Sequence, residues 1–146
     1  MKHILLFLLL AAVAGLFAFC KSNKPKHSAD MLPPKQLRWG SGGGFTGKET
    51  VNTLLENGQI FQFSSMTNQI TELGGTKAKT AKGHFAKATT SGLDLLNFNN
   101  PGNMYYFIET KDGEATNRVT WGDEKTPLMQ EVKDFYTALQ QLLATK

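Results

Sequence analysis

Cysteine and histidine are scarce in this sequence. One Cys among 146 residues excludes an intramolecular disulfide, and one Cys with three His cannot build the usual four-ligand zinc site. Beyond residue 36 the chain has no Cys and a single His, His84, which excludes a Cys–His nucleophile pair there. Charged residues make up 19% and hydrophobic residues 40%, which excludes both a disordered tail and a polytopic membrane protein. We therefore expect no metal and no cofactor.

The net positive charge comes from residues before 37, and most of it from one short segment. The net charge is +4, and residues 20–36 carry four Lys against Asp30 alone. Residues 37–146 hold eleven basic and eleven acidic residues, so this part of the chain is neutral. The basic isoelectric point therefore gives no support to nucleic-acid binding, and the charged segment is better suited to anionic lipid headgroups.

One apolar run opens the chain at residues 4–19, and Lys2 and His3 precede it. Its 16 residues suit the core of an export signal and are short for a membrane-spanning helix. Cys20 ends the run, as the acylated Cys does in bacterial lipoproteins, although Phe19 is bulkier than the residue that usually precedes it. We predict a lipoprotein-type signal peptide at residues 1–19, acylation of Cys20, and export to the membrane of the bacterial cell envelope.

Other outcomes compete at this segment. Cleavage after Ala14, within Ala-Val-Ala, would release a soluble protein, and an uncleaved run would itself anchor the chain.

Residues 20–36 contain three Pro and little apolar content, which is typical of a tether. Fully extended, the part from Lys21 to Gln36 would reach about 50 Å.

Residues 37–146 are predicted to form one small α+β domain. Alternating and β-branched stretches predict strands, and apolar residues at helical spacing predict helices. Thr126-Pro127 is interpreted as the N-cap and first residue of the last helix. The order β-β-β-α-β-β-α indicates an antiparallel sheet of about five strands covered by helices. The expected strands are 37–39, 49–55, 59–63, 104–110 and 115–121; apolar residues at 66–73 and 78–88 mark the first helical region, and those at 128–142 mark the second.

Two short patterns sharpen this outline. Asn57-Gly58 is a strong hairpin signal and indicates a type I′ turn, in which both central residues have positive φ. Trp39 and Trp121 each precede a Gly at the end of an expected strand. We interpret both as core aromatics, and a shared exposed aromatic edge is the alternative.

Residues 41–47 form a glycine-rich segment that we interpret as a loop. Gly42 to Lys48 matches G-x-x-x-x-G-K, but Glu49 stands where a P-loop has Ser or Thr, and a strand rather than a helix is expected to follow. This excludes nucleotide binding. Either the glycines supply the positive φ of a bend, or the loop binds a protein partner with Phe45 at its tip. The candidate partner-binding residues are Gly42, Gly43, Gly44, Phe45, Thr46 and Gly47.

Groups suited to catalysis are few. Ser91, His84 and Asp94 have the side chains of a catalytic triad, but nothing around them resembles a nucleophile elbow. A lone His without an evident base or orienting partner is better interpreted as a surface residue, so we expect no enzyme. Two groups of charged residues are interpreted as solvated. The acidic group is Glu109, Asp112, Glu114, Asp123 and Glu124, and a calcium site at Asp123 and Glu124 is the alternative. The basic group is Lys77, Lys79, Lys82 and Lys87, and contact with acidic lipid or glycan is the alternative.

Three segments, at residues 39–47, 101–107 and 119–122, resemble those of uncharacterised small lipoproteins of Bacteroidetes type. That resemblance spans most of the domain and implies no particular activity. The order of elements, with Gly-Gly-Phe-x-Gly at 43–47, also resembles emfourin-type inhibitors of thermolysin-like metalloproteases. The chain departs from that family in carrying an export signal, and the resemblance implies a protease-binding function.

Together these observations predict a lipid-anchored envelope protein whose domain binds a ligand without catalysis. A metalloprotease inhibitor is the first alternative, and a small hydrolase using His84 is the second. The expected contacts are the membrane, through the anchor, and a protein partner at the glycine-rich segment, with no nucleic acid and no nucleotide.

The first testable prediction concerns Cys20. We expect mass spectrometry of the purified protein to show a mature chain that begins at an acylated Cys20, because a lone Cys ends the apolar run. Cys20→Ala should accumulate uncleaved precursor. A mature N-terminus at Gly15, or an unmodified Cys20, would contradict the prediction.

Overall fold

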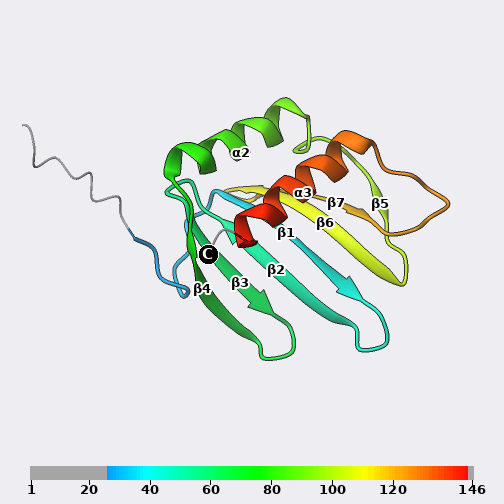
Figure 1. The fold of residues 1–146 in the computed structure, drawn as a ribbon, viewed down its shortest axis with the longest axis horizontal. Helices are drawn as coiled ribbons and strands as arrows, with labels where there is room; N and C mark the ends of the chain where they lie inside the picture. Colours follow the sequence, from blue (N-terminus) through cyan, green and yellow to red (C-terminus); the bar gives the residue numbers. More distant parts are fainter. Residues whose placement is uncertain (1–25, 145–146) are drawn as a thin grey trace, which may run out of the picture.

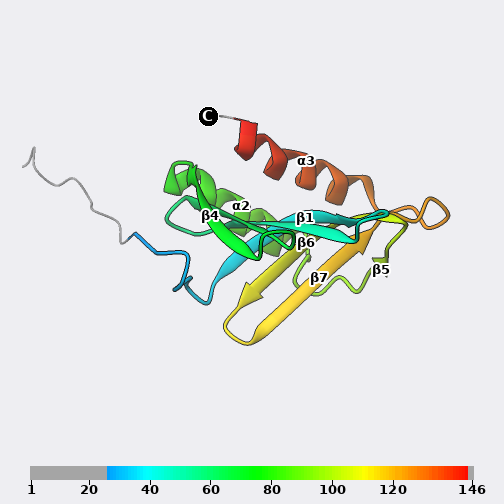
Figure 2. The same ribbon diagram turned by 90° about the horizontal axis from the view of Figure 1, so that it is seen from below.

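The computed structural model describes residues 26–144, which contain a seven-stranded sheet and two helices (Figure 1). The strands lie in the order β4-β3-β2-β1-β6-β7-β5, and every neighbouring pair is antiparallel except β5 with β7. Both helices lie on the same face of the sheet (Figure 2). The α+β class is therefore confirmed, with seven strands rather than about five. The elements are β1 (Gln36–Gly43), β2 (Lys48–Leu54), β3 (Gln59–Ser64), β4 (Gln69–Gly75), α2 (Ala78–Thr90), β5 (Asn99–Asn100), β6 (Met104–Asp112), β7 (Ala115–Trp121) and α3 (Gln130–Ala144).

The strand β4 replaces the first of the two helical stretches expected before residue 90. Met66, Ile70 and Leu73 have helical spacing, yet residues 65–68 form a turn and the chain then pairs with β3. Asn68 adopts a φ of 51°, which reverses the chain. The prediction was wrong because three apolar residues at this spacing also fit a strand, and pairing with β3 decided between them. The short β5 was not predicted and is held by parallel pairing with β7.

The hairpin between β2 and β3 forms where Asn57-Gly58 predicted it, but with a different turn. Gly58 has a φ of 97°, whereas Asn57 is not in the left-handed region. The Leu55 N–H donates to the Gln59 carbonyl (3.0 Å), and the Gly58 N–H donates to the Leu55 carbonyl (2.9 Å). The loop therefore has three residues with one glycine at positive φ, and the type I′ turn is corrected.

The two helices differ in how they reach the sheet. In α2 the buried residues are Ala78, Ala81 and Ala88, small side chains that allow close approach. In α3 they are larger, and this helix begins at Gln130 rather than at Pro127. The Thr126 hydroxyl is 3.2 Å from a carboxylate oxygen of Asp123, so it belongs to a turn before the helix.

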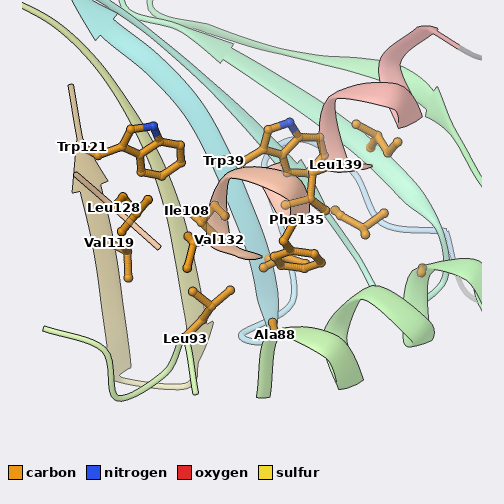
Figure 3. Packing of buried hydrophobic residues seen from close by; sticks show 14 residues of the cluster. Trp39, Ala88, Leu93, Ile108, Val119, Trp121, Leu128, Val132, Phe135 and Leu139 are labelled. Atoms are coloured by element: carbon orange, nitrogen blue, oxygen red, sulfur yellow. The ribbon is translucent and has the colours of Figure 1, made fainter. Parts of the chain in front are cut away.

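The core lies between the helices and the sheet (Figure 3). Trp39 and Trp121 are both buried in it, which fits their interpretation as core aromatics and excludes an exposed aromatic edge. Trp121 also meets Tyr136 of α3 edge-on, with ring centroids 5.1 Å apart. The remaining members include Leu37, Leu54, Ile108, Val119, Val132, Phe135 and Leu139.

The segment before β1 is fastened to the domain from residue 26 onward. The side-chain amide of Gln59 accepts a hydrogen bond from the His27 N–H (2.7 Å) and donates one to the His27 carbonyl (3.0 Å). Lys26 pairs with Glu72 at 3.4 Å, and Lys35 pairs with Glu56 at 3.0 Å. Much of the expected tether therefore lies against the domain, and Cys20 lies outside the described residues. Within residues 26–144 no helix is long and apolar enough to cross a membrane.

Substitution of Phe135 tests the packing of α3 against the sheet. Phe135→Ala should lower the free energy of unfolding by about 3–5 kcal/mol, because it removes a fully buried ring from the centre of the core. Chemical denaturation measures it, with Met129→Ala as the control, since Met129 is exposed just before the same helix. A loss below about 1 kcal/mol for Phe135→Ala would contradict the packing described here.

Candidate functional site

The glycine-rich segment forms a tight hairpin turn instead of a loop of seven residues. Gly42 and Gly43 belong to β1 and pair with Glu49 and Lys48 of β2, which corrects their assignment to a loop. Only residues 44–47 form the turn, closed by a hydrogen bond from the Gly47 N–H to the Gly44 carbonyl (3.1 Å). Lys48 starts a strand, as expected, and not the helix that a P-loop requires.

Glycine is required in this part of β1 because other groups occupy the space of a side chain. A Cβ at Gly42 would lie 2.5 Å from the Tyr105 hydroxyl. One at Gly40 would collide with the Thr50 carbonyl of β2 and lie 2.9 Å from the Phe107 ring, and one at Gly43, where φ is +94°, would collide with the Asn103 carbonyl. The glycines therefore let β6 and its aromatic rings approach β1 closely, rather than making a loop flexible.

Phe45 projects from this turn and is fully exposed. Two further apolar side chains are exposed at the same end of the sheet: Met104 of β6, which pairs with Gly43, and Met66, in the turn between β3 and β4. The Gly44 N–H donates to the Asn103 carbonyl (2.7 Å), which ties the turn to the start of β6. We call Phe45, Met66 and Met104 the apolar tip.

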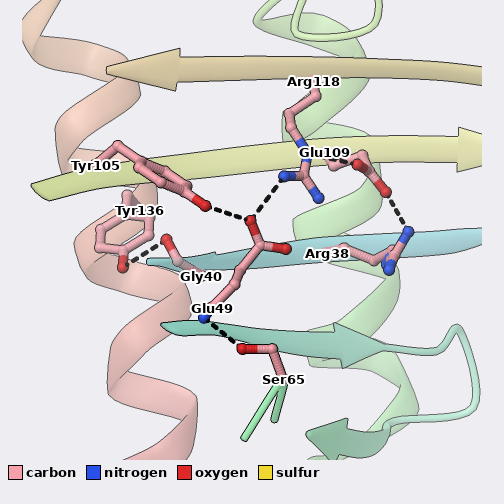
Figure 4. Close-up of polar contacts among 8 residues, drawn as sticks. All are labelled: Arg38, Gly40, Glu49, Ser65, Tyr105, Glu109, Arg118 and Tyr136. Carbon is pink, nitrogen blue, oxygen red and sulfur yellow. Dashed lines mark hydrogen bonds and ion pairs between the residues drawn. The ribbon is translucent and has the colours of Figure 1, made fainter. Parts of the chain in front are cut away.

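The base of the tip is fixed by hydrogen bonds around Glu49. The Tyr105 hydroxyl donates to a carboxylate oxygen of Glu49 (2.8 Å), and the Arg118 guanidinium lies 3.2 Å from the same oxygen (Figure 4). The Glu49 N–H donates to the Ser65 hydroxyl (2.8 Å), and the Ser65 N–H donates to the Glu49 carbonyl (3.0 Å). One residue therefore connects β2 to β6, to β7 and to the turn that carries Met66.

These contacts belong to a charged network on the face of the sheet that the two helices leave uncovered. Glu109 contacts Arg38 with one carboxylate oxygen and accepts a hydrogen bond from the Arg118 Nε with the other (2.7 Å). The Arg118 guanidinium also stacks 3.9 Å from the centroid of the Phe107 ring. Glu109 is only 5% exposed, so its interpretation as a solvated strand-end charge is corrected.

The interactions of this network raise the pKa values of Tyr105 and Arg118, which keeps both groups protonated. The hydrogen bond to Glu49 raises the pKa of Tyr105, with burial and the Glu49 charge acting in the same direction, so the hydroxyl keeps the proton that it donates. Burial works against the charge on Arg118, but the hydrogen bonds and opposite charges of Glu109 and Glu49 outweigh it and raise the pKa of Arg118.

His84 lies on α2, half-buried against Phe135, with ring centroids 6.0 Å apart. Burial, together with the charge of Lys87, lowers the pKa of His84. No hydrogen bond joins His84 to Ser91 or Asp94 in the part of the chain that the structure describes, so these three residues do not form a triad there.

The acidic pair Asp123-Glu124 lies in the loop before α3. The Asp123 carboxylate accepts a hydrogen bond from the Lys125 N–H (3.2 Å) and contacts the Thr126 hydroxyl, as a turn-forming Asp does. Between residues 26 and 144, no group of three or more His, Cys, Asp or Glu side chains is arranged to hold a metal ion.

Sequence reasoning proposed Phe45 as a candidate but did not predict the interactions that hold the base of its turn. Glu49, Tyr105, Glu109 and Arg118 come from three strands, and their pairing depends on register. The available signal was the alternation of β6, which places Tyr105, Phe107 and Glu109 on one face.

No protein-family model matches this chain, and a search of curated proteins finds no match.

The network generates a stability prediction. Glu109→Ala should lower the free energy of unfolding by about 2–3 kcal/mol, because it leaves two partly buried guanidinium groups without their shared acceptor. Thermal or chemical denaturation measures this, with Glu114→Ala, in the exposed turn between β6 and β7, as the matched control. Equal effects of the two substitutions would contradict a structural role for the network.

Proposed function

We propose that this protein is a lipid-anchored component of the bacterial cell envelope whose domain binds a partner protein through the apolar tip, without catalysis. The observation that carries the proposal is the full exposure of Phe45 on a turn whose base is tightly bonded. Large apolar side chains exposed at one end of a sheet can mark a binding surface. Because the turn is already held in place, little conformational freedom is lost when a partner binds.

The placement of the tip supports this function. The described chain enters β1 at Gln36, and β1 leads across the sheet to the turn that carries Phe45 (Figure 1). Eight residues of strand span about 26 Å. The tip therefore lies at the far end of β1 from the N-terminal segment and, on an anchored protein, faces away from the attachment point.

A metalloprotease inhibitor is a second candidate, and one observation favours it. The Gly-Gly-Phe-x-Gly segment at residues 43–47 projects as a narrow hairpin with an aromatic side chain at its end, a shape that can enter a concave active site. The hydrolase alternative gains no such support, since His84 faces Phe135 rather than a nucleophile.

Substitution of Phe45 tests the binding function. Phe45→Ala should weaken capture of an envelope partner by about thirtyfold, the effect of removing an aromatic anchor worth about 2 kcal/mol. Its melting temperature should stay within about 1 °C of the parent, since the ring makes no buried contact. Met31→Ala, which removes another exposed apolar side chain away from the tip, is the control and should leave capture unchanged. Unchanged capture by Phe45→Ala would overturn the role of the tip.

The inhibitor candidate has a direct assay. The domain should slow a thermolysin-like protease at stoichiometric amounts and remain intact, and Phe45→Ala should lose this effect. Rapid cleavage between residues 44 and 47, or no slowing at micromolar concentration, would remove this candidate.

A further inference from the structure

The N-terminal segment is already bound to the domain at His27, whereas the sequence suggested a tether free as far as residue 36. Gln59, itself largely buried, holds both backbone groups of His27, and Lys26 pairs with Glu72. If Cys20 carries the anchor, only six residues join it to His27, from Lys21 to Lys26. Six residues span at most about 20 Å, compared with about 50 Å for a tether that is free to residue 36.

A basic surface lies next to this attachment point. The helix α2 and its N-cap carry four Lys and no acidic residue, whereas the domain as a whole has no net charge. Lys35 connects the N-terminal segment to this helix, because its ammonium group lies 5.7 Å from the centroid of the Phe85 ring. We call Lys35 with the lysines of α2 and its N-cap the basic surface; the latter are Lys77, Lys79, Lys82 and Lys87. Lys87 lies at the border of this surface toward α3, with its ammonium group 5.5 Å from the centroid of the Phe135 ring.

An exposed leucine and a groove border the basic surface. Leu95 is 84% exposed in the turn after α2, and this turn is fixed because the Asn117 amide donates to the carbonyls of Leu93 (2.7 Å) and Leu96 (3.0 Å). Leu95 forms part of the wall of a cavity of about 370 Å³ that Lys35, Phe85 and Lys111 also line. Asp94 and Asp112 line it too, and Glu56 pairs with Lys35, so the excess positive charge comes from α2.

We propose that the basic surface and Leu95 dock on the anionic lipid headgroups of the membrane in which the protein is anchored. This inference rests on the lipid anchor of the proposed function, and it adds the orientation of the domain relative to the membrane. Lysines next to an anionic bilayer strengthen attachment by about fivefold each, and an exposed apolar side chain among them enters the headgroup region. The domain then lies with α2 toward the lipid and the apolar tip toward the solvent.

Docking of the domain through α3 is less favourable than docking through α2, because of the charges on the two helices. The helix α3 carries Glu131 and Asp134 against Lys133, so anionic lipid does not attract it. The six-residue limit keeps His27, where the N-terminal segment meets the domain, within about 20 Å of the bilayer. Salt at physiological strength screens charge over about 8 Å, so the lysines are attracted once the domain approaches the bilayer to about that distance.

The experiment uses the full chain, purified with its anchor and reconstituted into vesicles. Leu95→Cys is labelled with an environment-sensitive fluorophore, and Phe45→Cys is labelled in the same way as the matched control, since both side chains are exposed. The parent chain is treated with the same fluorophore, and its signal shows how much labelling occurs at Cys20. Quenching by nitroxide-bearing lipids is measured in vesicles of phosphatidylglycerol with phosphatidylethanolamine, and in vesicles of phosphatidylcholine alone.

We expect residue 95 to be quenched about twofold or more in the anionic vesicles, and residue 45 not to be quenched in either. The effect should fall in phosphatidylcholine vesicles and at about 1 M salt, where the screening length is about 3 Å. Replacing Lys79, Lys82 and Lys87 together with Gln should reduce quenching at residue 95. Lys125→Gln, an exposed lysine in the loop before α3, should not.

Flotation of the vesicles separates the two proposals. Protein that floats with the vesicles but shows no quenching at residue 95, or equal quenching at residues 45 and 95, overturns the docked orientation and leaves the anchor standing. Protein that does not float overturns the anchor and, with it, the docked orientation. Binding of a partner by the apolar tip is measured independently of both.

Discussion

The structure depends on two glycines in its central strand. Because Gly40 and Gly42 have no side chains, the rings of Phe107 and Tyr105 lie across β1, where any Cβ would collide with them. Phe107 is fully buried in this position even though no helix covers that face of the sheet, since the Arg118 guanidinium stacks on the ring. A sheet with helices on one face only thus acquires a packed second face.

The same close approach of β6 to β1 determines where the charged residues meet. With the ring of Phe107 between β1 and Arg118, the guanidinium reaches Glu109 on one side and Glu49 on the other. Each carboxylate therefore has a cationic partner, which offsets the cost of removing it from water. Tyr105 completes the arrangement by donating to Glu49 at the base of the hairpin turn. The apolar tip is in this way supported by the centre of the sheet.

The molecule consequently has two ends of different character. One end presents apolar side chains on a tightly bonded turn, and at the other end the N-terminal segment meets the domain. β1 joins the two ends, since it starts beside Lys35 and finishes at the turn that carries Phe45. The apolar tip and the place where the N-terminal segment is bound are therefore kept apart by a rigid strand.

Local patterns in the sequence were sufficient for several features. The Asn57-Gly58 hairpin, the helix at Ala78–Thr90 and the apolar face of α3 follow from turn chemistry and periodicity, which act over a few residues. The exposure of Phe45 was one of two stated alternatives, because neighbouring glycines are compatible with either a bend or a projecting loop.

What the sequence by itself determined was therefore the α+β class, the position of most elements and the location of the net positive charge before residue 37. Only the tertiary structure decided that residues 69–75 form a strand, that the glycines belong to β1 and that Glu109 is buried between two arginines. Arg38 and Glu109 are 71 residues apart in the chain. Their contact depends on the register of β1 with β6, and register is set by packing across the whole sheet rather than by any local pattern.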